Sequence, residues 1–417
     1  MTLVGVDEVL EAQKLLDGVV RTTPVENSRV LAARVGGPAY LKCENLQRSG
    51  SFKIRGAYVR IARLSPSERA AGVVAASAGN HAQGVALAAR LLGSTATIFM
   101  PVNAPLPKVE ATRAYGAQVQ LTGHTVDEAL AVATDYAQEQ GRVFIHPFDH
   151  PDVIAGQGTV GLEILEQRPD VRTILVSTGG GGLLSGIGVA VKAARPEVRV
   201  VGVQAEQAAA YPGSLTAGRP LALETMATMA DGIAVGCPGR LTFEHVRAVA
   251  DDMLTVSEEA LSRALLLCLE RAKLVVEPAG VAGVAALLEE PRRFEPPVLA
   301  VLSGGNIDPV LLLRVVQHGL IAAGRYLSFR VRVPDRPGEL ARLLGLLADL
   351  GGNVLDVEHS RTGPRLHLGE VEVALSIETR GPEHGAELVA ALRRAGHTIT
   401  FGDLHDVLQV GLGMSGS

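Results

Sequence analysis

Residues 173–191 read TILVSTGGGGLLSGIGVAV, and this uncharged stretch determines the architecture expected for the chain. Its length approaches that of a membrane-spanning helix. Residues 179–182, however, are four successive glycines. Each glycine inside a helix costs roughly 1 kcal/mol relative to alanine. We therefore expect a buried strand, a glycine loop and a following helix rather than one long helix.

The same alternation of strand, turn and helix extends outward over residues 70–320. The apolar runs that resemble strands are GVVAAS (72–77), ATIFM (96–100), AQVQLT (117–122), VFIHP (143–147), TILVST (173–178), VRVVGVQA (198–205) and PVLAVLSGG (297–305). This order predicts an α/β protein with largely parallel sheets and helices on both faces. Several strands end in turns rich in Ser, Gly and Asn, and ligands bind at those ends in open α/β sheets.

The sequence changes character from about residue 325, after the segment QHGLIAAGR (317–325). The runs that follow are YLSFRVRV (326–333), PGELARLLGLLADLG (337–351), NVLDVEHS (353–360), LGEVEVALSIE (368–378), GAELVAALRRAG (385–396) and TITFGD (398–403). They read as strand, helix, strand, strand, helix, strand. That order is typical of a ferredoxin-like domain, so we expect a domain boundary near residue 322.

Composition excludes several classes of protein. The chain has 417 residues, of which 47% are hydrophobic and 20% charged, with a net charge of −5, as in a globular protein of two or three domains. It has no Trp and 3% aromatic residues, which argues against nucleic-acid binding. Cys43, Cys237 and Cys268 show no metal-ligand spacing, and the N-terminus reads as an amphipathic helix rather than a secretory signal. We expect a cytoplasmic protein that does not enter a membrane.

The segment SGSFKIRG (49–56) contains a lysine that could act as a nucleophile. Ser49 or Ser51 is a suitable N-cap, which would place Lys53 in the first turn of a helix. A cation is disfavoured there by the helix dipole, and Arg48 and Arg55 lie close in sequence. An amine whose charged form is penalised is a better nucleophile. The alternative is an ordinary solvated surface lysine.

Two loops resemble anion sites. The segment STGGGGLLSG (177–186) places glycines before a helix, which favours phosphate, although it matches neither G-x-G-x-x-G nor the P-loop. The segment ASAGNHAQG (76–84) could hold a carboxylate through Ser77 and Asn80. Its alternative is a capped turn in which Asn80 and His81 satisfy local backbone groups. A reactive lysine with a phosphate site and a carboxylate site predicts pyridoxal phosphate bound to Lys53.

Six segments together resemble the threonine dehydratase and serine racemase group of fold-type II pyridoxal-phosphate enzymes, which share the tryptophan-synthase-β fold. They are SGSFKIRGA, ASAGNHAQGVALAARLLG, STGGGGLLSG, ADGIAV, VVEPAG and VLSGGNID, in order within residues 1–322. The tail, VRVPDRPGELARLLGLLADLGGNVLDVEHSR, resembles one regulatory ACT domain, expected over 325–408. The resemblance implies a small lobe at about 48–150 and a large lobe from 1–47 and 151–322.

The resemblance also implies roles for individual residues. Lys53 would be the Schiff-base lysine, with Phe52 beside the cofactor ring, Asn80 on the ring hydroxyl oxygen and Ser303 on the pyridine nitrogen. The cofactor phosphate would lie on Gly179, Gly180, Gly181, Gly182 and Leu183. The substrate carboxylate would lie on the turn formed by Ser77, Ala78, Gly79, Asn80 and His81, where His81 reads more as local structure than as an acid or base. Glu277 belongs to the cofactor site, or alternatively caps a helix.

The implied reaction converts L-threonine to 2-oxobutanoate and ammonia, and L-serine to pyruvate, in isoleucine biosynthesis. Alternatives are a catabolic deaminase, a racemase and a non-catalytic amino-acid sensor. Ala78 argues against a racemase because it cannot donate a proton to the opposite face of the substrate carbanion. No metal site is expected, since Gln204 and Ala210 stand where the racemase branch would have carboxylates, although Glu206 lies nearby. We expect a homodimer or homotetramer regulated by isoleucine or valine, with Asn353 at the effector.

Overall fold

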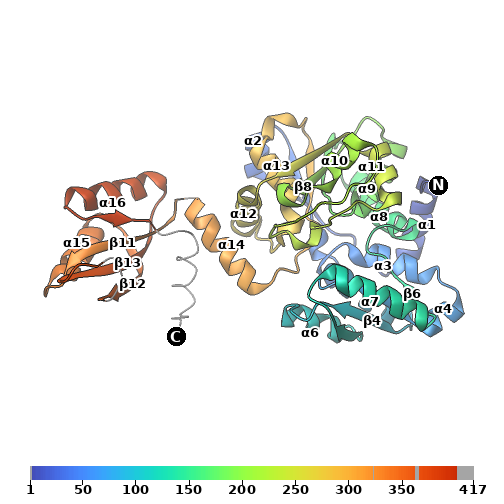
Figure 1. The fold of residues 1–417 in the computed structure, drawn as a ribbon. Helices are drawn as coiled ribbons and strands as arrows, with labels where there is room; N and C mark the ends of the chain where they lie inside the picture. The colour runs from blue at the N-terminus through green and yellow to red at the C-terminus, as the bar shows by residue number, and fades with distance from the viewer. Residues whose placement is uncertain (1, 323, 362–365, 402–417) are drawn as a thin grey trace. The chain divides into compact units, whose positions relative to one another are not determined.

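The computed structural model describes residues 2–322, 324–361 and 366–401 (Figure 1). The chain divides after Pro309 into two compact units. Helix α14 (Pro309–Ala322), which the sequence analysis grouped with the first 322 residues, therefore clusters with the C-terminal unit. Residues 402–408, the end of the expected ACT domain, lie outside the described residues.

A six-stranded sheet forms the larger lobe of the N-terminal unit. Its order is β1-β2-β10-β7-β8-β9, and all neighbours are parallel except β1 and β2. The strands are β1 (Val25–Asn27), β2 (Ala39–Lys42), β7 (Thr173–Ser177), β8 (Arg199–Ala205), β9 (Asp252–Val256) and β10 (Val298–Val301). The sequence analysis did not identify β1, β2 or β9. Strand β9 begins with the half-buried Asp252 and Met253 and includes the exposed Thr255.

A four-stranded parallel sheet forms the smaller lobe, in the order β5-β4-β3-β6. Its strands are β3 (Val73–Ala76), β4 (Ala96–Met100), β5 (Gln118–Leu121) and β6 (Val143–Phe144). The first two are buried along their whole length, as expected for parallel strands covered on both faces. All seven strands predicted within residues 70–320 are present.

Helices cover both faces of the larger sheet. In Figure 1, α8 and α9 are green and α13 is orange-yellow. Alternate residues of β7 separate the two faces, because Ile174 packs with α8 and α9 while Leu175 lies against Gly283 of α13. The helices of this unit are α1 (Val6–Leu16), α2 (Arg29–Val35), α3 (Lys53–Ala62), α4 (Pro66–Ala71), α5 (Asn80–Leu91), α6 (Leu106–Ala114), α7 (Val126–Glu139), α8 (Pro151–Gln167), α9 (Gly182–Ala194), α10 (Ala210–Ala217), α11 (Arg240–Val249), α12 (Glu258–Leu267) and α13 (Ala282–Glu289).

The C-terminal unit has the predicted ferredoxin-like order. An antiparallel sheet, β12-β13-β11-β14, is built from β11 (Tyr326–Pro334), β12 (Asn353–Ser360), β13 (Glu370–Glu378) and β14 (Ile399–Thr400). The helices α15 (Glu339–Asp349) and α16 (Pro382–Arg394) follow β11 and β13. Strands β11 and β13 pair in register, and their inward side chains form a core with residues of both helices.

No helix within the described ranges combines the length and the hydropathy of a membrane-spanning segment. The stretch at 173–191 is divided as predicted, into strand β7, a glycine loop and helix α9. The glycines of the loop lie against Phe148 and Tyr211, which leave no space for side chains at Gly180 and Gly181.

Candidate active site

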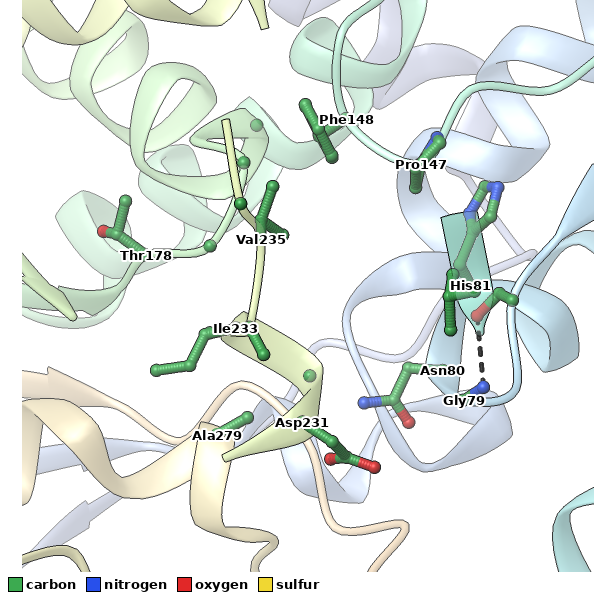
Figure 2. Close-up of a pocket in the computed structure, with 18 of the residues that line it drawn as sticks. Gly79, Asn80, His81, Pro147, Phe148, Thr178, Asp231, Ile233, Val235 and Ala279 are labelled. Atoms are coloured by element: carbon green, nitrogen blue, oxygen red, sulfur yellow. Dashed lines mark hydrogen bonds between the residues drawn. The ribbon is translucent and has the colours of Figure 1, made fainter. Parts of the chain in front are cut away.

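A cavity of about 860 Å³ lies in the N-terminal unit where the loops after β3, β7 and β10 meet. Every site residue predicted in that unit lines it: Phe52, Lys53, Ser77, Ala78, Gly79, Asn80, His81, Gly179, Gly180, Gly181, Gly182, Leu183, Glu277 and Ser303. Figure 2 shows Asn80 and His81 on one side of the cavity and Thr178, Ile233 and Val235 on the other. Residues far apart in sequence thus gather at the carboxyl ends of strands.

The glycine loop is required by close neighbours as well as by backbone conformation. A Cβ atom on Gly180 would collide with the Phe148 ring, and one on Gly181 would collide with the Tyr211 hydroxyl. Gly181 also has φ +92°, in the left-handed region, at the N-cap of α9. The first N–H groups of α9 have no acceptor within the helix. The loop therefore offers backbone donors and a positive dipole end to an anion.

Lys53 is the first residue of α3, and its amine faces the cavity wall. Its Nζ donates to the Pro147 carbonyl at 3.0 Å and lies 5.3 Å from the centroid of the Phe52 ring. Burial lowers the pKa of Lys53 to about 8, although Glu277 acts in the opposite direction. An amine with this pKa is partly neutral near neutral pH, so the reading as an ordinary surface lysine is wrong.

Lys53 lies in the first turn of a helix as expected, but neither the expected helix cap nor the expected effect of Arg55 is found. The N-cap of α3 is Phe52, without a side-chain cap, so neither Ser49 nor Ser51 caps the helix. Ser49 instead has φ +61°, and Ser51 forms a β-bridge with Gly304. The Arg55 guanidinium is paired with the carboxylates of Glu44 and Glu163, so its charge is compensated. Removal of the amine from solvent, rather than repulsion by neighbouring arginines, accounts for the shift.

The loop after β10 pairs with the loop before Lys53. The Phe52 N–H donates to the Ser303 carbonyl at 3.2 Å, and the Gly305 N–H donates to the Gly50 carbonyl at 2.8 Å. These bonds hold Ser303 beside the chain segment that carries Lys53. Ser303 is buried, and it lines the cavity.

Asn80 and Glu277 form a hydrogen-bonded pair across the cavity. The Asn80 amide nitrogen donates to the Glu277 carboxylate, and the Asn80 amide oxygen accepts from Asn306 at 2.7 Å. Burial raises the pKa of Glu277 to about 7, with Asp231 contributing and with Asn80, Lys108 and Lys53 acting in the opposite direction. The Glu277 side chain makes no capping bond to the short helix at Pro278–Val281, so the reading as a helix cap is wrong.

The turn after β3 satisfies part of its own hydrogen bonding. The Ser77 hydroxyl accepts from the Gly79 N–H at 3.1 Å, as the dashed line in Figure 2 shows. The His81 imidazole is bonded to the Ile145 carbonyl at 2.8 Å, and burial, aided by Lys53, lowers its pKa to about 3. His81 is therefore a neutral structural group, in agreement with its interpretation as local structure. The same interpretation is wrong for Asn80, because its amide bonds to the side chains of Glu277 and Asn306, which are distant in sequence.

A family model described as pyridoxal-phosphate dependent enzyme matches residues 16–304, and an ACT domain model matches residues 328–396. The chain belongs to the pyridoxal-phosphate-dependent enzymes. L-threonine ammonia-lyase of Thermotoga maritima is 49% identical over 95% of this chain and 99% of the relative. Catabolic L-threonine dehydratase of Escherichia coli (strain K12) is 42% identical over 73% of this chain and 94% of the relative. A solved threonine deaminase from T.th. is 43% identical, with a TM-score of 0.70, and covers 73% of this chain and 99% of that one.

These findings confirm the expected fold, the ACT domain and the dependence on pyridoxal phosphate. The cavity of this pyridoxal-phosphate enzyme fits the cofactor in three respects. Close contacts with Phe148 and Tyr211 leave no space for a side chain at Gly180 or Gly181, so the loop at α9 offers bare backbone to a phosphate. The Ser177 hydroxyl lines the cavity and is buried without a hydrogen-bond partner among the described residues. The Lys53 amine is within the same cavity and has the lowered pKa that carbonyl chemistry needs.

Sequence reasoning missed several residues of this enzyme's cavity. The missed residues include the three that follow β6, namely His146, Pro147 and Phe148. The Pro147 carbonyl accepts from Lys53, and the Phe148 ring packs against His146 and lies against Gly180 of the glycine loop. The run VFIHP predicts the strand, but the loop after it has no glycine-rich or Ser-Asn pattern that would indicate a site. At the mouth, Lys108 forms an ion pair with Asp231 at 2.7 Å, joining the two lobes. Proximity of two lobes gives no signal in a single sequence.

The region where related racemases are expected to hold a metal carries a different interaction here. The Gln204 side-chain oxygen accepts from the Tyr211 N–H at 2.9 Å. Within the described residues, no three His, Cys, Asp or Glu side chains gather in metal-ligating geometry.

In the C-terminal unit, the predicted effector residue Asn353 begins β12. Its amide donates to the Glu378 carboxylate at 3.0 Å, and the residue is exposed. The glycine turn before it is tied to α16 through His384, which bonds to the Leu350 carbonyl at 2.9 Å and accepts from the Arg380 N–H at 3.0 Å. The role of Asn353 stays a prediction.

Proposed function

We propose that this enzyme deaminates L-threonine to 2-oxobutanoate and ammonia, and L-serine to pyruvate, with pyridoxal phosphate attached to Lys53. The observation that carries the proposal is the Lys53 amine, which lies in a cavity between a glycine loop and a Ser-Asn turn with a pKa of about 8. Relatives at 49% and 42% identity named for threonine support the substrate.

The chain's own residues would hold the cofactor at several points. Gly179–Leu183 would bind its phosphate, Phe52 would lie beside its ring, Asn80 would donate to its ring oxygen, and Ser303 would meet its pyridine nitrogen. When bound, pyridoxal phosphate supplies the electron sink that makes the substrate α-proton acidic. A serine hydroxyl at the pyridine nitrogen, in place of a carboxylate, does not keep that nitrogen protonated, which favours prompt loss of a β-hydroxyl over a long-lived carbanion.

Lys53 would accept the α-proton. Its amine is partly neutral at neutral pH, and Nζ is held by the Pro147 carbonyl at 3.0 Å. The substrate carboxylate would be held by the turn from Ser77 to His81. His81 takes no part in proton transfer in this proposal, because its imidazole is bonded to the Ile145 carbonyl and is neutral.

Racemisation is the first alternative, and Ala78 is the residue that argues against it. A racemase needs a proton donor on the face opposite Lys53, and alanine has none. We expect elimination to be far faster than racemisation, and Ala78→Ser to raise racemisation of serine. Chiral chromatography of recovered serine measures both. A parent enzyme that racemises serine as readily as it deaminates it would contradict this account.

We further propose that the ACT domain, expected over 325–408 in addition to the catalytic region 1–322, makes the enzyme allosteric. We expect a homodimer or homotetramer in the cytoplasm. Isoleucine is the favoured effector, with valine next, which would place the reaction in isoleucine biosynthesis. Allostery requires that the effector bind two states with different affinity, and a coupling of about 1 to 3 kcal/mol changes affinity roughly 5- to 150-fold. Asn353→Ala should weaken the effect of isoleucine.

A coupled assay of 2-oxobutanoate release from threonine, with and without isoleucine, tests the proposal. Parallel assays with serine and with the Lys53→Ala variant give the substrate preference and the background. We expect turnover of threonine that isoleucine lowers. A yellow holoenzyme that releases no 2-oxobutanoate would contradict the threonine assignment, and a colourless protein would favour the amino-acid sensor. Turnover that isoleucine does not change would instead favour a catabolic deaminase.

A further inference from the structure

Asn306 lies in the loop after β10, outside the lining of the cavity, and its side-chain amide is fully used as a donor. Its Nδ2 donates to the Ser49 carbonyl at 2.6 Å and to the Asn80 amide oxygen at 2.7 Å. An amide nitrogen carries two hydrogens, so these two acceptors account for both. Rotating the amide by half a turn would lose both bonds and bring its oxygen against two other oxygens. The orientation of the Asn306 amide is therefore fixed.

The fixed amide of Asn306 in turn decides how Asn80 is oriented. Because the Asn80 oxygen accepts from Asn306, the Asn80 nitrogen is turned the other way, where it donates to Glu277. Asn80 and Glu277 line the cavity, so the donor end of the Asn80 amide is the end presented there. Without Asn306, the Glu277 carboxylate alone would favour this orientation of the Asn80 amide, and the opposite orientation would present an acceptor.

The surrounding backbone leaves room for this chain of amides. Gly50 has φ +72°, and a Cβ atom there would collide with the Asn306 amide. A Cβ atom on Gly304 would lie 2.9 Å from the Asn80 amide nitrogen and would collide with Glu277. Ser49, whose carbonyl accepts from Asn306, has φ +61°, which is uncommon for a residue with a side chain. Three loop positions are thus adapted to this arrangement.

We propose that Asn306 is a positioning residue of the cofactor site: it fixes the Asn80 amide with its nitrogen toward the cavity, so that Asn80 presents a donor to the ring oxygen of pyridoxal phosphate. The inference rests on the role proposed for Asn80 and is independent of which amino acid the enzyme deaminates. A purely structural role, in which Asn306 only joins two loops, is the competing account.

The variant Asn306→Asp tests the proposal with little change of shape. A carboxylate cannot donate to Asn80 and would repel its amide oxygen, so the Asn80 amide should no longer be held with its nitrogen toward the cavity. Loss of one oriented hydrogen bond costs about 1 to 1.5 kcal/mol, so the apparent Kd for pyridoxal phosphate should rise about 10-fold when apoenzyme is titrated. The absorption maximum of the bound cofactor should shift as well. Asn103→Asp, at an exposed residue outside the cavity lining, is the control for added charge and should change neither value.

A double-mutant cycle with Asn80→Ala separates positioning from loop structure. If Asn306 acts through Asn80, Asn306→Asp should change the apparent Kd less than about 2-fold once Asn80 is alanine. An equal 10-fold change in both backgrounds would overturn the proposal, and so would an unchanged Kd and spectrum in the single variant. Should Asn306→Asp fail to fold, Asn306→Ala removes the same donors without adding charge, and the same cycle decides. Because neither readout uses an amino-acid substrate, a failed threonine assignment cannot produce either result.

Discussion

Lys42 and Lys53 are two lysines of the N-terminal unit with opposite electrostatic surroundings. Lys42 is fully buried, and its Nζ donates to the Glu163 carboxylate at 2.6 Å and to the Thr23 carbonyl at 2.8 Å. Lys53 has one recorded acceptor among the described residues, the uncharged Pro147 carbonyl. A buried charge is tolerated when it is paired and hydrogen-bonded, and otherwise the group becomes neutral more easily. The bonding partners of each lysine, rather than the residue type, therefore decide which amine is available for chemistry.

The ion pairs around Lys42 also reach the helix that carries Lys53. Arg55, in the first turn of α3, bonds to Glu44 at 2.8 Å and to Glu163 at 2.7 Å. Burial raises the pKa of Glu44, but the Arg55 guanidinium outweighs burial and holds that pKa below its ordinary value. The first turn of α3 therefore carries two basic side chains. Arg55 is neutralised and fixed in place by two carboxylates, whereas Lys53 has no carboxylate bonded to it among the described residues.

The largest expected effect comes from removing the unpaired amine. Lys53→Ala should lower turnover at least about 10⁴-fold, more than about 5 kcal/mol of activation free energy, because it removes both the proposed covalent attachment and the proposed base. Steady-state kinetics of holoenzyme, with circular dichroism to check folding, measures this. Lys42→Arg keeps a cation at the paired position and should retain activity. A Lys53→Ala variant whose turnover is within about 10-fold of that of the parent would contradict the role proposed for Lys53.

Breaking the ion pair between Lys42 and Glu163 should chiefly lower the stability of the fold. Lys42→Met leaves Glu163 with one cation instead of two, and the loss of one partner of a buried pair typically lowers the free energy of unfolding by about 3 to 5 kcal/mol. Denaturant unfolding of the apoprotein measures it. Arg172→Met is the matched control, since Arg172 and Glu295 pair at the surface with side chains 58% and 61% exposed, and should cost about 1 kcal/mol or less. If Lys42→Met and Arg172→Met lowered the free energy of unfolding equally, the buried pair would be no more stabilising than the surface pair, which would contradict this prediction.

The unpaired lysine should lower the stability of the apoprotein in a pH-dependent way. Its folded pKa of about 8 lies below its ordinary value of 10.5, so the folded state loses stability as pH falls from 10.5 to 8 and recovers none below that. Lys53→Met lacks this loss. Its apoprotein should be more stable than the parent by about 1 to 3 kcal/mol at pH 7, with the difference closing toward pH 10.5. Unfolding curves at pH 7 and pH 10 test this, and a difference independent of pH would contradict it.

The smallest effect belongs to a third lysine, Lys108, which is paired at the mouth of the cavity. Its partner Asp231 has a side chain that is 57% exposed, so the pair contributes about 0.2 to 1 kcal/mol. Lys108→Gln should raise KM about 2- to 5-fold with kcat unchanged. Asp231→Asn should have a similar effect, and the double variant should add little to either. Additive effects would show that the two side chains act separately.

Strands and the glycine loop were predictable because they depend on local sequence. Short apolar runs such as VRVVGVQA, rich in β-branched residues and bounded by turns, favour strands, and four successive glycines argue against a helix interior. Strand β9 was missed because its polar residues hide the apolar pattern, and the caps proposed at Ser49 and Ser51 failed because those residues pair with the loop after β10 instead.

The electrostatics of the site could not be predicted to the same extent. The lowered pKa of Lys53 was expected in part for the wrong reason, because sequence places Arg55 close by without showing that Glu44 and Glu163 neutralise it. The bonds of Asn306 and the pair between Lys108 and Asp231 join segments more than a hundred residues apart. Such contacts follow from the folded arrangement of the loops and leave no periodic signal in one sequence.

We propose that the unpaired Lys53, and not a paired lysine, carries the cofactor. Borohydride reduction of the holoenzyme followed by peptide mass mapping tests it directly, because reduction makes the bond between lysine and cofactor permanent. We predict the added mass of the reduced cofactor on the peptide that contains Lys53. An adduct on Lys42 or Lys108, with Lys53 unmodified, would contradict the account.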